Sequence, residues 1–98
     1  MEITVNKNEN TLTISPIGRI DTATAPELQT AVNENISGVT DLTFDLKQLQ
    51  YISSAGLRVL MSTQKTMNQQ GSMKLIHVKD DVNEIFDVTG FSDILTIE

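Results

Sequence analysis

The segment from Asp41 to Leu46 constrains the fold more than any other part of this sequence, because its apolar and polar residues alternate strictly. Leu42, Phe44 and Leu46 are apolar and the residues between them are polar, which is the period-two pattern of a half-buried strand. A parallel strand that helices cover on both faces is almost continuously apolar instead. The pattern therefore predicts a sheet whose helices cover one face only.

Four further strand patterns surround this segment. The alternating runs Ile3–Val5 and Leu12–Ile14 are separated by polar, turn-forming residues, and they predict an antiparallel hairpin. Pro16 and Gly18 are expected to close its second strand. Two later runs, Met73–Val78 and Ile94–Ile97, predict two more strands. The expected fold is α/β, with a mixed, mostly parallel sheet of about five strands and an N-terminal hairpin.

Three helical patterns separate the later strands. After a loop at 18–21, Thr24 and Glu27 have the spacing of a capping box, and the helix should end near Gly38. The second helix is predicted from about Ser54 to Gln69, and the third from Asp80 or Asp81 to Gly90. Right-handed crossovers between successively added strands place all three helices on the same face. This agrees with the one-sided alternation at 41–46.

Length and charge limit the function. The chain has 98 residues, which suits one domain spanning 1–98. It has no cysteine and a single histidine, His77, so neither metal nor cofactor is expected. The formal net charge of −6 opposes nucleic-acid binding. No run approaches the ~18 apolar residues of a membrane span, and there is no signal peptide pattern, so we expect a cytoplasmic protein.

The residues between the central strand and the second helix are the candidate functional stretch. Ser53 and Ser54 stand where a helix begins, and Ser54 is either a helix cap or an exposed hydroxyl that a partner protein modifies. The small residues that follow, up to Gly56, would let a partner approach the backbone. Arg58 is predicted on the polar face of the helix, and Val59 lies off its apolar stripe and should be partly exposed.

Acidic residues at two other strand ends are candidates for the same rim of the sheet. Loops after parallel strands gather at one edge, so Asp21, Thr22 and Asp45 are expected near Ser54. For Asp21 and Thr22 the alternatives are a partner-binding rim or local turn hydrogen bonding. Asp45 could instead hold down the loop that follows it.

Several segments together resemble one known family, the STAS-domain anti-sigma factor antagonists of bacteria. Gly18–Asp21 with Ala25–Leu28 is similar to the start of that family's first helix. Phe44–Leu46 followed by Ile52–Leu57 looks like its central strand and phosphorylation loop, and Thr89–Phe91 matches the end of its last helix. The order and spacing of these segments extend the resemblance over nearly the whole chain.

The resemblance implies a phospho-regulated binding module without catalysis of its own. In the family, an anti-sigma factor with serine kinase activity binds the unmodified antagonist, releases its sigma factor and phosphorylates a serine at the start of the second helix. A metal-dependent serine phosphatase reverses the modification. By position the acceptor is Ser54, with Ser53 second, because Ser53 stands where many members have aspartate. The expected partner-binding residues are Asp21, Thr22, Ser53, Ala55, Gly56, Arg58 and Val59.

Two other functions are alternatives to this one. A related STAS module could serve, without phosphorylation, as a subunit of a lipid-transport complex or a signalling scaffold. A serine nucleophile would need the elbow pattern Gly-x-Ser-x-Gly, but Ile52 stands where its first glycine belongs. Nothing in the spacing places His77 beside Ser54 as a base, so the chain is not expected to be an enzyme.

Overall fold

The computed structural model describes residues 1–98 and has one five-stranded mixed sheet. Strands β1 (Glu2–Asn8) and β2 (Thr11–Ile20) are antiparallel, and β3 (Asp41–Asp45) and β5 (Ser72–Ile76) extend the sheet in parallel, in the order β1-β2-β3-β5. The fifth strand, β4 (Leu49–Ile52), pairs with β2 alone. The predicted α/β fold with an N-terminal hairpin is confirmed.

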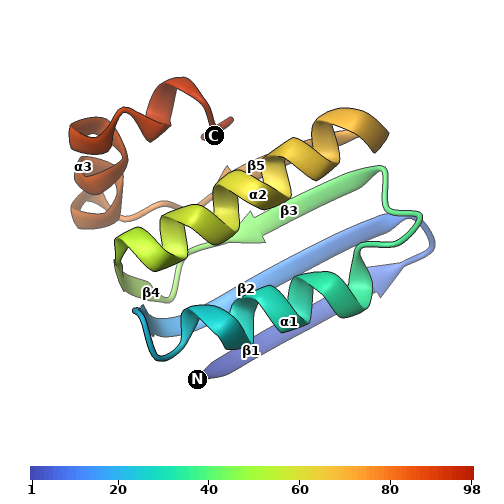
Figure 1. Cartoon of the computed structure of the whole chain (residues 1–98), viewed down its shortest axis with the longest axis horizontal. Coiled ribbons are helices and arrows are strands. Elements are labelled where there is room, and N and C mark those ends of the chain that lie inside the picture. The colour runs from blue at the N-terminus through green and yellow to red at the C-terminus, as the bar shows by residue number, and fades with distance from the viewer.

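Matching residues of neighbouring strands explain the one-sided alternation. Ile14 of β2, Phe44 of β3 and Leu75 of β5 are in register, and all three are fully buried. Helices α1 (Ala25–Asn35) and α2 (Ser54–Gln70) lie side by side over this face, as Figure 1 shows. The alternating register positions at Thr13, Thr43 and Lys74 belong to the opposite, polar face. The polar residues at 41–46 therefore belong to the face of the sheet that α1 and α2 do not cover.

Strand β2 is longer than predicted, and the expectation that Pro16 and Gly18 end it is wrong. It continues through both residues to Ile20, so the loop expected at 18–21 is mostly strand. Gly18 has φ +96°, which glycine adopts freely, and the pairing with β4 shifts register between Gly18 and Arg19. Its amide donates to the Gln48 carbonyl at 2.9 Å. This irregularity lets β2 pair with β3 in its first half and with β4 in its second.

The capping box predicted for α1 does not form. Thr24 has helical φ and ψ angles, and its amide donates to the side chain of Asp21, three residues earlier. Glu27 instead forms an ion pair with the amino group of Met1, at 3.2 Å. The Asp21 carboxylate binds amides that precede the helix, and the first-turn amides of Ala25 and Glu27 donate to the backbone carbonyls of Asp21 and Thr24 instead of to a side chain.

The buried face of α2 is broader than a single apolar stripe. Leu57, Leu60 and Gln64 are buried, and so are Gly56, Val59, Thr63 and Met67. Val59 is only 6% exposed, so the expectation that it is partly exposed is wrong. The physical reason is the position of α2, which packs against α1 as well as β4 and β5.

The C-terminal region forms one helix and one short contact with the sheet. Helix α3 (Asp80–Thr89) buries Val82 and Phe86, packs against β4, and ends at Gly90 with φ +81°. The strand predicted at Ile94–Ile97 is reduced to a single parallel bridge between Ile97 and Leu75, and a 3₁₀ turn, η1 (Phe91–Asp93), precedes it. Hence the fifth strand of the sheet is β4, which the sequence did not reveal.

Candidate functional site

The two adjacent serines differ in the accessibility of their hydroxyls. Ser53 is the N-cap residue of α2 with an extended backbone, but its Oγ makes no capping bond and is buried without any hydrogen-bond partner. Ser54, the first residue of the helix, is exposed. A partner protein can therefore reach the Ser54 hydroxyl, whereas the Ser53 hydroxyl faces the protein.

A backbone hydrogen bond joins the serine loop to the loop that precedes α1. The Ser53 amide donates to the Ile20 carbonyl at 2.8 Å, where the paired strands β2 and β4 end together at Ile20 and Ile52. Asp21 directly follows Ile20, so the structure places Asp21 and Thr22 beside the start of α2. The expectation that these residues share one rim with Ser54 agrees with this arrangement.

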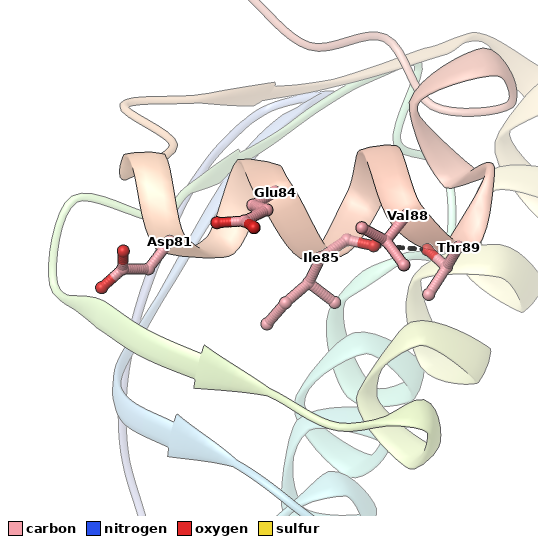
Figure 2. Close-up of a pocket in the computed structure, with 5 residues that line it drawn as sticks. All are labelled: Asp81, Glu84, Ile85, Val88 and Thr89. Carbon is pink, nitrogen blue, oxygen red and sulfur yellow. Dashed lines mark hydrogen bonds between the residues drawn. The ribbon is translucent and has the colours of Figure 1, made fainter.

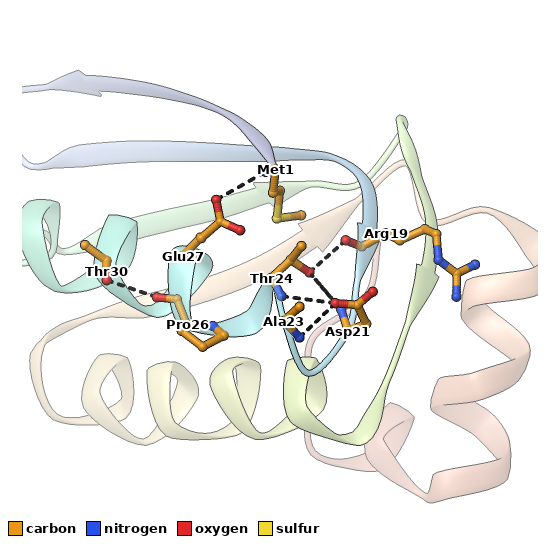
Figure 3. Close-up of polar contacts among 8 residues, drawn as sticks. All are labelled: Met1, Arg19, Asp21, Ala23, Thr24, Pro26, Glu27 and Thr30. Carbon is orange, nitrogen blue, oxygen red and sulfur yellow. Dashed lines mark hydrogen bonds and ion pairs between the residues drawn. The ribbon is translucent and has the colours of Figure 1, made fainter.

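The Asp21 side chain forms a compact turn, drawn in Figure 3. Its Oδ1 atom accepts from the amides of Ala23 and Thr24, both at 3.0 Å, and the Asp21 amide donates to Thr24 Oγ1 at 2.8 Å. The Thr24 amide is the main reason that the pKa of Asp21 lies below its usual value, although desolvation opposes the shift. The local turn bonding considered from the sequence is thus present, and the adjacent Thr22 side chain is exposed.

Asp45 makes its contacts with a different part of the rim. Its Oδ1 atom lies 3.0 Å from His77 Nδ1 and accepts from the Lys47 amide at 3.2 Å. It makes no hydrogen bond with the Ser53–Ser54 loop. Through the Lys47 amide Asp45 holds down the loop that follows it, which is the structural role considered as the alternative, and through His77 it also links the end of β3 to the residue after β5.

The Asp45–His77 pair makes the fold sensitive to acid. Burial would raise the pKa of Asp45, but the bonds from His77 and the Lys47 amide hold it below the usual 3.8. Because the folded pKa is depressed, the ionised carboxylate stabilises the fold above about pH 4, and this contribution is lost as the pH falls through the folded pKa.

We expect Asp45→Asn to weaken this acid sensitivity, because the amide keeps the shape of the side chain but does not titrate. Urea unfolding at pH 6 and pH 3 measures the loss of stability on acidification, which should be smaller in the variant than in the wild type. Asp93→Asn, at an exposed carboxylate, is the control. An equal loss in wild type and Asp45→Asn would contradict this role for the pair.

Gly56 supports the site from below and is not available to a partner. It is buried in the first turn of α2, and a Cβ there would lie 2.6 Å from both Ile20 Cγ2 and Ile52 Cγ1. Val59 is also part of the core. Of the other α2 residues expected to contact a partner, Arg58 is exposed and Ala55 is half-buried.

A cation–π pair beside the site was not predicted. Arg19 of β2 and Tyr51 of β4 are register partners, and the Arg19 Cζ atom lies 4.4 Å from the centroid of the Tyr51 ring. Both side chains are exposed. Their contact depends on the β2–β4 pairing, and the only signal of β4 in the sequence was a pair of apolar residues, Leu49 and Ile52.

Other chemical features of the chain are few. No group of three or more His, Asp or Glu side chains is arranged to hold a metal ion. None of the helices combines the length and apolar character needed to cross a membrane. The site is an exposed hydroxyl at a helix N-terminus, beside a hydrogen-bonded acidic turn, and this geometry suits modification by another protein and contact with it.

The fold and this site define a class of regulatory domain that comparisons with known proteins identify. Residues 2–98 match the model of the STAS domain. The chain therefore belongs to the STAS domain family, as the sequence segments indicated. It is 34% identical over 98 residues to the anti-sigma-B factor antagonist of Bacillus subtilis strain 168, covering 99% of this chain and 90% of that relative.

Solved structures agree on the fold. The anti-sigma factor antagonist SpoIIAA in its unphosphorylated form matches with a TM-score of 0.84 at 15% identity, over 99% of this chain and 88% of that chain. The phosphorylated form of the Bacillus cell fate determinant SpoIIAA matches with a TM-score of 0.76 at 14% identity, over 99% of this chain and 91% of that chain. The chain is thus similar, within the STAS family, to anti-sigma factor antagonists.

Proposed function

We propose that this chain is an anti-sigma factor antagonist switched by phosphorylation of Ser54. The unmodified form binds an anti-sigma factor with serine kinase activity and so frees the sigma factor. Phosphorylation by that kinase ends the binding, and a metal-dependent serine phosphatase restores it. The observation that carries the proposal is the contrast between an exposed Ser54 and a buried Ser53 Oγ at the start of α2.

The chain itself can tolerate a phosphate at Ser54. A helix N-terminus favours an anion by about 0.3–1 kcal/mol, and the first turn of α2 has no acidic residue to repel one. Arg58 follows four residues later, at a spacing that puts both side chains on one side of the helix. The Arg58 side chain is exposed and forms neither an ion pair nor a hydrogen bond in the unmodified protein.

The partner would contact the exposed part of the rim. Thr22, Ser54 and Arg58 are exposed, and Asp21 and Ala55 are partly so. The negative net charge of −6 favours a basic partner surface. Gly56 and Val59 are buried beneath this surface: Gly56 lets the first turn of α2 lie close to Ile20 of β2 and Ile52 of β4, and Val59 belongs to the core.

Phosphate mapping tests the proposal directly. The protein is incubated with candidate anti-sigma factor kinases of the same organism and ATP, and mass spectrometry locates the modified residue. We expect one phosphate on Ser54 in the wild type, none in Ser54→Ala, and an unchanged site in Ser53→Ala. Because Ser53 Oγ has no partner, Ser53→Ala should cost little stability. Modification of Ser53, or of neither serine with any candidate kinase, would overturn the proposal.

A further inference from the structure

Helix α3 presents an apolar face to solvent, close to the start of α2. Val88 is 80% exposed, the highest value among the exposed large hydrophobic residues, and Ile85 is half-buried beside it. With Asp81, Glu84 and Thr89 these two residues line a hollow of about 350 Å³, shown in Figure 2. Val82 and Phe86 already supply the core contacts of the helix, so the fold does not need Val88.

The spacing of the five residues fits a helical partner. They occupy positions i, i+3, i+4, i+7 and i+8 of one helix, counted from Asp81, which is one continuous helix face. Since all of them belong to α3, the hollow is open on the side away from that helix and cannot enclose a small molecule. An apolar side chain inserted from a second helix would fill it.

The charge of α3 indicates the sign of the partner. The helix carries Asp80, Asp81, Glu84 and Asp87 and has no basic residue. Two of these carboxylates, Asp81 and Glu84, line the apolar hollow directly. A segment with Lys or Arg beside a central apolar residue is complementary to this arrangement.

The hollow lies next to the proposed phosphorylation site. Helix α3 packs against β4, the strand that leads into Ser53 and α2. Figure 2 shows Ile85 on the side of α3 that faces this strand and the start of α2. A partner positioned at Ser54 would therefore also reach α3.

Resting on the proposed function, we infer that this face of α3 docks a basic amphipathic helix of the partner kinase while Ser54 enters its active site. The apolar residues anchor that helix, and Asp81 and Glu84 pair with its basic side chains. The contact is separate from the transferred phosphate, so it acts on recognition and not on the chemistry at the hydroxyl.

Val88→Asp tests the apolar anchor without disturbing the core. With the kinase that phosphorylates wild-type Ser54, we expect KM to rise about tenfold, a typical loss for a central apolar contact, with kcat within about twofold. The matched control is Asn68→Asp, which adds the same charge in the last turn of α2 at an exposed position. It should leave KM within about twofold, and circular dichroism should show the same fold for both variants.

Charge reversal tests the acidic rim. Glu84→Lys should raise KM about threefold and weaken its dependence on salt, whereas Glu34→Lys, at an exposed position near the end of α1, should change neither. Equal KM values for Val88→Asp and Asn68→Asp would overturn the inference and leave the proposed function intact. If no candidate kinase modifies wild-type Ser54, both the inference and the proposed function fail.

Discussion

Phosphate on Ser54 is expected to lower the affinity for the partner kinase about a hundredfold or more, while the domain stays folded. A phosphate adds about −1.5 to −2 charges at pH 7. At an interface this charge must be desolvated against the partner, at a cost of several kcal/mol for an uncompensated charge, and each 1.4 kcal/mol is tenfold in affinity. Within the chain the same group sits at the N-terminus of α2, where it is slightly stabilising.

Calorimetric binding and thermal melting of the two forms measure this difference. The phosphorylated protein, the unmodified protein and Ser54→Asp are compared with Ser62→Asp, an exposed position two turns further along α2. We expect binding to weaken only in the phosphorylated protein and in Ser54→Asp. The melting temperatures of all four proteins should agree within a few degrees. Retained binding by the phosphorylated form would contradict the switch, as would a loss of fold.

Gly56→Ala is expected to destabilise the domain by about 1–2 kcal/mol and to slow phosphorylation of Ser54. The new Cβ would lie 2.6 Å from Ile20 Cγ2 and from Ile52 Cγ1, both in side chains that are 1% exposed. Overpacking of this kind costs about 1–3 kcal/mol, and the better helix propensity of alanine offsets up to about 1 kcal/mol of it. Relief of the clash lifts the first turn of α2, which carries Ser54.

Urea unfolding and the initial rate of phosphorylation measure the two effects separately. Ser62→Ala is the control, because it changes a small exposed residue of the same helix and should stay within about 0.5 kcal/mol of the wild type. A Gly56→Ala protein as stable as this control would show that Ile20 and Ile52 yield easily to the added methyl group. The proposed support of the site by Gly56 would then be wrong.

Local patterns predicted the layers of the fold but not the course of β2. Leu42 and Phe44 alternate with polar neighbours because one face of their sheet is buried, and this physical cause acts residue by residue. Pro16 and Gly18 read as a strand end, because they usually interrupt strands. Within β2, Gly18 bonds to the distant Gln48 and Pro16 lies opposite Ile3 of β1, and no local pattern encodes either partner.

The site likewise combines features that local patterns predict with features that depend on distant contacts. The helix start at Ser54 was predictable, because small polar residues precede an apolar helical pattern there. The burial of Ser53 Oγ was not predictable, because it depends on the hydrogen bond from the Ser53 amide to the Ile20 carbonyl, a residue distant in the sequence. The exposure of Val59 was predicted wrongly for a similar reason, because the pattern of a single helix carries no information about how many neighbouring elements surround α2.

The hydrogen bond from the Ser53 amide to the Ile20 carbonyl has a consequence for substrate recognition. Many kinases bind an extended, flexible peptide in their active site, but here the residue before Ser54 is bonded to the end of β2, and Ser54 itself begins helix α2. The proposed kinase would therefore have to accept a preformed surface, and its specificity would reside in the tertiary structure instead of a linear consensus. Short peptides spanning the two serines would lack the geometry that the enzyme reads.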